Sequence, residues 1–129
     1  MTGSPGTGKN SIGHELADLM GLEFFSINEF AIEAGLGKWR GGEFLVDTKM
    51  LKGKIDPMNR VVSGHLLPYV VPDSKLDFVA ILRCSPKELR RRCELRGYAR
   101  AKIAENLEAE MIGVVAVKSL QEYGRQKVV

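Results

Sequence analysis

The chain has 129 residues, of which 44% are hydrophobic and 27% are charged, a balance typical of one globular domain rather than of a disordered segment. The formal net charge is only +3, and most of the positive excess lies between Arg83 and Lys102, which weakly favours an anionic partner. No apolar run approaches the length of a membrane span and no leader pattern opens the chain, so we expect a cytoplasmic protein without membrane contact.

The first half of the chain predicts helices and strands in alternation. Apolar residues at helical spacing follow a glycine-rich opening segment, and Gly21 is a natural stop for that helix. The later elements that we expect in this half are a strand over Leu22 to Ile27, a helix capped by Asn28 and reaching about Ala34, a mobile glycine-rich loop over Gly35 to Glu43, and a short helix capped by Asp47.

The second half continues the alternation. Ser85 is a suitable cap, and Pro86 then stands at the first helical position. The expected elements are a strand over Arg60 to Ser63, a loop over Gly64 to Ser74, a strand over Asp77 to Leu82, a helix from Ser85 to Arg96, and a long helix over about Ala101 to Tyr123. This alternation predicts an α/β fold, with a parallel sheet flanked by helices on both faces.

A phosphate-binding loop is the clearest motif. The segment Gly3-Ser4-Pro5-Gly6-Thr7-Gly8-Lys9 fits the pattern G-x-x-x-x-G-K and leads directly into a predicted helix. Its backbone N–H groups and the helix N-terminus would surround phosphate oxygens, while the lysine would neutralise charge on the moving phosphoryl group. A plain glycine-rich turn is the alternative. The predicted nucleotide-binding residues are Gly3, Ser4, Pro5, Gly6, Thr7, Gly8, Lys9, Asn10, Ser11 and Arg96.

The two ends of the chain indicate a smaller sheet than a P-loop fold usually has. In P-loop folds the phosphate loop follows a buried strand, but only Met1 and Thr2 precede Gly3. The last three residues, Lys127 to Val129, are typical of the beginning of another strand. We therefore expect a three-layer P-loop NTPase fold that lacks its first strand and its C-terminal end.

Residues 89–110 carry a family resemblance. The stretch Arg92-Cys93-Glu94-Leu95-Arg96-Gly97-Tyr98, followed by Lys102-Ile103, Glu105-Asn106 and Glu108-Ala109-Glu110, resembles the lid and the next helix of archaeal adenylate kinase-like proteins. These proteins are relatives of the eukaryotic adenylate kinase isoenzyme 6. The segments Ser26-Ile27-Asn28, Gly64-His65-Leu66 and Val79 to Arg83 match in order and spacing, so the resemblance covers nearly the whole chain.

The resemblance implies one domain over residues 1–129, with a monophosphate-binding segment at about 26–49 and a lid at about 95–105. It implies a kinase that converts ATP and AMP to two ADP with Mg²⁺ as cofactor, and that has ATPase activity. It further implies a role in maturation of the small ribosomal subunit, through a platform ribosomal protein and rRNA. A rival function is a nucleotide-gated ribosome-assembly factor with little or no kinase activity, and a fragment without function is a third alternative.

Three residues depart from the expected pattern. Asn10 stands where the loop motif has a Ser or Thr that holds Mg²⁺, although an amide oxygen can still coordinate the metal. Ser63 stands where the resembling family has an acidic residue two positions before His65. Ile32 replaces an arginine that the family often has on the monophosphate side, and Lys38 or Arg40 could reach a phosphate instead.

Further candidate residues follow from position. Arg92 and Arg96 share one helix face and could clamp the migrating phosphoryl group, or they could form a solvated basic surface. His65 follows a strand end, where α/β folds place ligands, and could order a substrate or an attacking water. Trp39 could stack on a base or simply pack. The predicted catalytic residues are Lys9, His65, Arg92 and Arg96, and the predicted metal ligand is Asn10.

Overall fold

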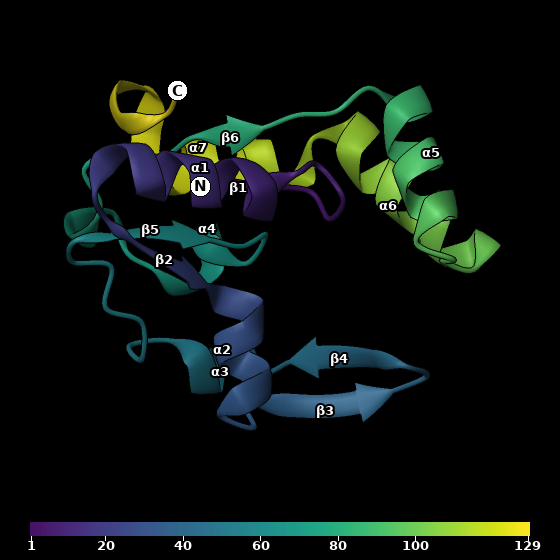
Figure 1. Cartoon of the computed structure of the whole chain (residues 1–129), viewed down its shortest axis with the longest axis horizontal. Coiled ribbons are helices and arrows are strands. Elements are labelled where there is room, and N and C mark those ends of the chain that lie inside the picture. Colours follow the sequence, from purple (N-terminus) through teal and green to yellow (C-terminus); the bar gives the residue numbers. More distant parts are fainter.

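Short parallel strands form the centre of the molecule, which a computed structural model describes over residues 1–129 (Figure 1). The strands of this region are β1 (Thr2–Gly3), β2 (Glu23–Ser26), β5 (Arg60–Ser63) and β6 (Ile81–Leu82), and a separate hairpin contains β3 (Gly37–Arg40) and β4 (Glu43–Val46). The helices are α1 (Lys9–Met20), α2 (Ile27–Glu33), α3 (Thr48–Leu51), α4 (Leu67–Val70), α5 (Pro86–Leu95), α6 (Arg100–Ile112) and α7 (Val114–Lys127), with a 3₁₀ turn at Asp73–Lys75.

Backbone hydrogen bonds join these strands in the order β2-β5-β1-β6. The β2-β5 and β1-β6 pairs are both parallel. The terminal amino group donates to the Val62 carbonyl at 2.7 Å, and the Gly64 N–H donates to the Met1 carbonyl at 3.2 Å, which places β1 beside β5. Val128 then pairs in parallel with Val79 at the other edge. The α/β prediction is confirmed: the strand before the loop is the two-residue β1, and Val128 near the end of the chain forms an isolated parallel bridge.

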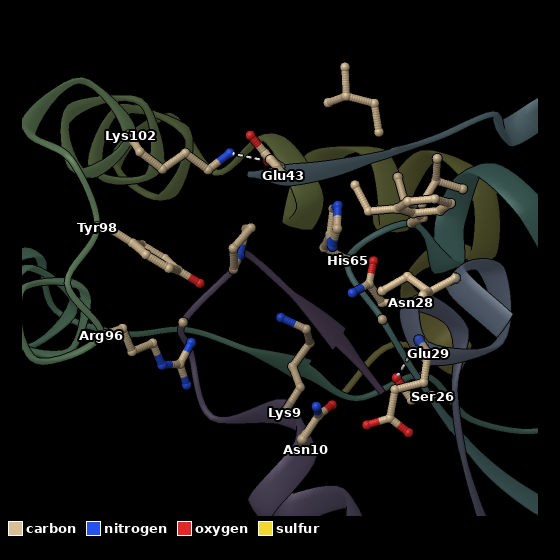
Figure 2. A pocket seen from close by; sticks show the side chains of 18 of the residues that line it. Lys9, Asn10, Ser26, Asn28, Glu29, Glu43, His65, Arg96, Tyr98 and Lys102 are labelled. Carbon is tan, nitrogen blue, oxygen red and sulfur yellow. Dashed lines mark hydrogen bonds and ion pairs between the residues drawn. The ribbon is translucent and has the colours of Figure 1, made fainter. Parts of the chain in front are cut away.

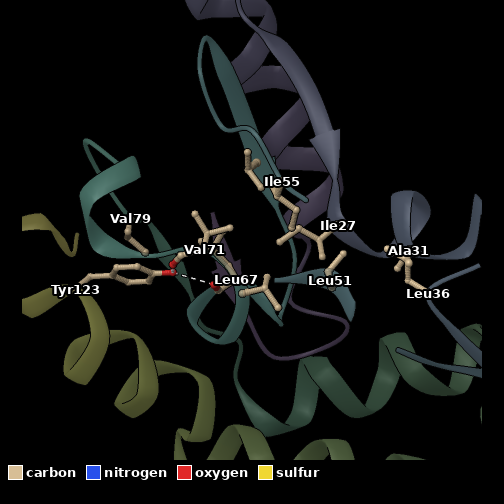
Figure 3. Packing of buried hydrophobic residues seen from close by; sticks show 11 residues of the cluster. Ile27, Ala31, Leu36, Leu51, Ile55, Leu67, Val71, Val79 and Tyr123 are labelled. Atoms are coloured by element: carbon tan, nitrogen blue, oxygen red, sulfur yellow. Dashed lines mark hydrogen bonds between the residues drawn. The ribbon is translucent and has the colours of Figure 1, made fainter. Parts of the chain in front are cut away.

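The main hydrophobic core lies between the sheet and helices α2, α3, α4 and α7. Eleven buried side chains form it, and Figure 3 shows the cluster extending from Val79 and Tyr123 at one end to Ala31 and Leu36 at the other. Tyr123 of α7 donates its hydroxyl towards the carbonyls of Leu67 and Val71, each at 2.8 Å, so the polar atom of this buried ring is satisfied. None of the helices combines the length and the apolar character that crossing a bilayer requires.

A second, smaller core joins α5 to α6. Its four buried members are Leu89, Cys93, Ile103 and Leu107. The cysteine thiols at positions 84 and 93 are both free. Ser85 caps α5 as predicted, because its hydroxyl accepts the Glu88 N–H at 3.3 Å. The helical pair therefore has its own packing, apart from the sheet.

The mobile loop expected over Gly35 to Glu43 is wrong, because this segment begins the β3-β4 hairpin. Gly41 and Gly42 have φ values of 58° and 78°, which are the left-handed angles of a tight two-residue turn. The register pairs Arg40 with Glu43 on either side of that turn. A Gly-Gly pair between two short extended runs was the hairpin signal that the loop prediction overlooked.

Other boundaries also differ from the predictions. Ser26, rather than Asn28, caps α2 by accepting the Glu29 N–H at 3.3 Å. The long helix over Ala101 to Tyr123 is wrong, because Gly113 (φ 75°) ends α6 and a new helix begins. The loop over Gly64 to Ser74 contains α4 and the 3₁₀ turn, and the strand over Asp77 to Leu82 is regular only at its end. Asp47 caps α3 as predicted.

Candidate functional site

The segment between β1 and α1 forms a tight loop in front of a helix N-terminus. Gly8 caps α1 without any side-chain hydrogen bond, so the first N–H groups of this twelve-residue helix are free to meet a ligand. A Cβ at Gly6 would lie 2.8 Å from Cδ1 of Leu89, so the loop packs directly against α5. A helix N-terminus with open N–H groups and a positive dipole end favours an anion such as phosphate.

Lys9 lies within this loop with its side chain folded back. The residue is buried, and Nζ donates to the Ser4 carbonyl at 2.8 Å. Burial, together with the positive charge of Arg96, lowers the pKa of Lys9 to about 8, against a smaller opposing effect from Glu110. A buried ammonium held next to another cation is poised to be stabilised by an incoming anion.

Glu110 of α6 supports the loop from behind, and sequence reasoning assigned it no role. Its buried carboxylate accepts Nε of Arg83 at 2.6 Å and the Cys84 N–H at 3.0 Å. Burial alone would raise the pKa of Glu110, but hydrogen bonds from Ser4, Arg83 and Cys84 together lower it. The Ser4 contact ties α6 to the phosphate loop. An acidic residue within a mainly polar helix gave no signal of this buried position.

The loop opens into a cleft of about 770 Å³, within the range that holds small-molecule ligands. Its walls are the loop with the start of α1, helix α2 with the hairpin, the residues after β5, and the turn between α5 and α6. Figure 2 shows Arg96, Tyr98 and Lys102 on one side of the open centre and Asn28 and Glu29 on the other. Predicted site residues that line this cleft are Pro5, Gly6, Gly8, Lys9, Asn10, Ser11, His65 and Arg96.

Four predicted residues do not line the cleft, namely Gly3, Ser4, Thr7 and Arg92. The Thr7 hydroxyl donates to the Ser4 carbonyl at 2.8 Å, which closes the loop on itself. Arg92 donates to Glu88 at 2.9 Å and to the Gly6 carbonyl at 3.3 Å, so it holds the loop from the α5 side. In this conformation Arg92 braces the loop, whereas the exposed Arg96 reaches the cleft.

His65 faces the same cleft from the end of β5. Burial, followed by the positive charges of Lys9 and Lys102, lowers the pKa of His65 to about 4, and Glu43 opposes this only weakly. The imidazole is therefore neutral at pH 7 and can accept as well as donate a hydrogen bond. His14, by contrast, lies on the exposed side of α1 with its ring 3.8 Å from that of Phe24.

An ion pair closes one side of the cleft. Nζ of Lys102 lies 2.6 Å from a carboxylate oxygen of Glu43, which joins α6 to the hairpin (Figure 2). The two residues are 59 positions apart, and the sequence prediction singled out neither for the site. The correct assignment of the β3-β4 hairpin would have placed Glu43 at a turn, but nothing local identifies its partner. The contact shows that the hairpin and the α5-α6 turn meet across the cleft.

The position where P-loop proteins hold Mg²⁺ contains two neutral side chains. The Ser63 hydroxyl at the end of β5 donates to Oδ1 of Asn10 in α1, over a long 3.4 Å. No group of three His, Cys, Asp or Glu side chains lies close enough together to hold a metal ion. Mg²⁺ is usually held by one or two carboxylates together with water and substrate phosphates, and neither side chain here supplies a carboxylate, so this donor set does not fit a protein-held Mg²⁺.

The hairpin side of the cleft is more apolar. Ile32, Trp39, Phe44 and Val46 all line it. Trp39 is 64% exposed, and its ring meets that of Phe44 edge-on at 5.3 Å between centroids. Lys38 and Arg40 do not line the cleft in this conformation. This wall could hold a flat aromatic group such as a base.

Comparison with known proteins finds relatives that are named as adenylate kinases. The family described as "AAA domain" matches residues 1–113. A protein named "Putative adenylate kinase" from Thermococcus gammatolerans is 38% identical over 130 residues, which are 95% of this chain and 69% of that protein. The "Adenylate kinase isoenzyme 6 homolog" of Caenorhabditis elegans is 30% identical over 95% of this chain and 72% of its own length. The Saccharomyces cerevisiae homolog FAP7 is 33% identical, over 95% and 66% respectively.

Proposed function

Because the chain belongs to the family of archaeal adenylate kinase-like proteins and adenylate kinase isoenzyme 6 homologs, we propose that it transfers a phosphoryl group from ATP to AMP. The observation that carries the proposal is the shape of the cleft. The phosphate loop with Lys9 forms one wall, the hairpin forms an apolar wall that suits a base, and Arg96 and Lys102 line the side formed by α5 and α6. Two nucleotides meeting at their phosphates would fill such a site.

The three-part layout belongs to the same proposal. The core with the loop takes ATP, residues 26–49 take AMP, and the turn at 95–105 acts as the lid. The α2 helix and the hairpin that make up most of residues 26–49 line the cleft opposite the loop. The separate packing of α5 with α6 gives the lid a base from which it can move without disturbing the sheet.

The chemistry asked of the side chains is positioning and charge neutralisation. The bond between the γ-phosphorus and its bridging oxygen breaks while an oxygen of the AMP phosphate bonds to the same phosphorus, giving two ADP. Lys9 and the loop N–H groups hold the phosphates of the donor, and Arg96 neutralises charge as the phosphoryl group moves. Neutral His65 positions the acceptor or, when AMP is absent, a water. Attack by that water gives ATPase activity as the side reaction.

A second candidate function is favoured by specific residues. Two findings count against kinase activity. The metal position has the neutral side chains Asn10 and Ser63, and the acceptor side has the apolar Ile32 in place of an arginine that would bind phosphate. The alternative is a nucleotide-gated factor in maturation of the small ribosomal subunit, which contacts a platform ribosomal protein and rRNA in the cytoplasm. In that case nucleotide binding changes the lid, and turnover is slow or absent.

Product analysis separates the two. The purified chain is incubated with ATP alone and with ATP plus AMP, and nucleotides and free phosphate are quantified. Two ADP per AMP consumed, without free phosphate, supports the kinase. ADP with an equal amount of free phosphate, unaffected by AMP, supports the ATPase and hence the gated factor. A Lys9→Met variant, which keeps the length of the side chain but not its charge, is the control for contaminating activity in either case.

A further inference from the structure

The cleft at the phosphate loop is lined by three cationic and two acidic side chains. Lys9, Arg96 and Lys102 all line the cleft. The lining carboxylates belong only to Glu29 and Glu43, and the latter is paired with Lys102 at 2.6 Å. Glu29 projects from the first turn of α2, on the wall opposite the lid (Figure 2). The lining charges without an ion-pair partner are those of Lys9, Arg96 and Glu29, which leave the cleft with a net positive charge.

The two side chains at the positions from which a P-loop protein would contact Mg²⁺ form a hydrogen bond with each other. In such proteins the loop hydroxyl and a strand-end aspartate hold the ion against the β- and γ-phosphates. Here Ser63 is fully buried at the strand end, and its only polar partner in the cleft is Oδ1 of Asn10. Neither side chain carries charge, so neither supplies the carboxylate that usually helps to hold the ion.

The charge of the nucleotide then decides whether free ATP or Mg·ATP binds more tightly. Free ATP carries about four negative charges and Mg·ATP about two, so a cleft with a net positive charge and no carboxylate at the metal position favours the free nucleotide. A strand-end carboxylate would reverse this preference, because it repels the free phosphates and attracts the ion. Its absence removes the usual reason for a P-loop protein to require the metal.

From these contacts we propose that the chain binds ATP as the metal-free anion, with its own lysines and arginine supplying the neutralisation that Mg²⁺ supplies elsewhere. The inference rests on the proposed nucleotide binding and deepens it. The site takes nucleoside polyphosphates whether or not a divalent cation is present. Any Mg²⁺ that enters with ATP is held by the phosphates and water alone.

The test is calorimetric titration of ATP into the whole chain, once in EDTA and once in excess Mg²⁺, at the same pH and ionic strength. We expect the affinity in EDTA to equal or exceed that in Mg²⁺. ATP binding that is at least tenfold tighter with Mg²⁺ would overturn the inference and leave the proposed function standing. ATP binding under neither condition would overturn both. If Glu29→Gln abolishes a preference for Mg²⁺, that preference came from Glu29, and the inference is equally wrong.

A variant reverses the preference. Asn10→Asp adds one carboxylate of almost identical shape at an exposed position in the first turn of α1, where an acidic residue suits the helix dipole. We expect it to weaken ATP binding in EDTA at least fivefold and to make binding at least tenfold tighter with Mg²⁺ than without. An Asn10→Asp variant that stays indifferent to Mg²⁺ would contradict the inference. Ser63→Asp, with Ser63→Asn as its matched control, repeats the test at the buried strand end.

Discussion

Two adjacent parts of the phosphate site differ in their charged side chains. The part that faces the anion keeps its lysine, whereas the part where P-loop proteins hold a metal ion has only neutral side chains. Lys9 is buried, hydrogen-bonded within the loop and backed by Arg92 and Glu110. Its neighbour Asn10 is exposed, neutral and joined to Ser63 by one long hydrogen bond. Loop geometry and metal chemistry are thus separable, since the loop depends on backbone packing and the metal site on a few side-chain oxygens.

We expect the largest effect on ATP binding when the charge of Lys9 is removed. The change Lys9→Met should weaken ATP binding about 100-fold, because the loop N–H groups alone then face the phosphates. Calorimetry gives the affinity, and thermal unfolding shows that the fold persists. A loss of less than about fivefold would mean that ATP does not enter through this loop. Lys118→Met, far from the cleft on α7, is the matched control and should bind like the parent.

A substitution at Glu110 tests whether the phosphate loop depends on the contacts that this carboxylate makes from α6. Replacing Glu110 with Gln removes the charge that holds Arg83 and weakens the contacts to Ser4 and Cys84, so it should cost about 2 kcal/mol of stability. ATP affinity should fall as well, because the loop loses its tie to α6. Chemical denaturation measures the first effect and calorimetry the second. Glu108→Gln, exposed on the same helix, should leave both within error.

The Lys9 pKa predicts a pH dependence of binding. In the free protein the pKa of Lys9 is lowered to about 8, and bound phosphate raises it. Above pH 8 binding must therefore take up a proton, and ATP affinity should fall by up to tenfold per pH unit. Titrations between pH 7 and pH 9.5 measure the slope. Lys9→Arg, whose guanidinium stays charged, should remove it; an equal slope in that variant would assign the effect to another group.

A further expected effect concerns His65, which lines the cleft close to Ser63. Its pKa is lowered from 6.5 to about 4, so the neutral form is the one that folding favours. This contribution is complete above pH 6.5 and is lost as the pH falls towards 4, by about 3 kcal/mol in all. Denaturation of the parent and of His65→Gln at pH 7 and pH 4.5 isolates it. The parent should lose more stability than the variant over this range.

The features that could be predicted best from the sequence depend on residues close together in the chain. A seven-residue motif fixed the phosphate loop, and the Ser85-Pro86 pair fixed the start of α5. The hairpin was missed because its glycines predicted a mobile loop rather than a two-residue turn. The break at Gly113 was missed because helical spacing continues on both sides of it.

The cleft itself could not be predicted in full, since its walls depend on contacts distant in sequence. The Glu43–Lys102 pair spans 59 positions, and the buried position of Glu110 depends on Arg83 and Ser4 arriving from other elements. No periodicity or motif identifies such partners. The departures at Asn10 and Ser63 were visible in the sequence, but only the fold shows that they face each other.

The small core between α5 and α6 has a consequence for the dynamics of the molecule. Four buried side chains hold this pair together, against eleven in the main cluster, so local unfolding of the pair should need less free energy than global unfolding. Amide hydrogens of α5 and α6 should therefore exchange with solvent sooner than those of β5. A bound polyphosphate that joins Arg96 to the loop would slow this exchange, so isotope labelling would report occupancy of the site without any enzymatic turnover.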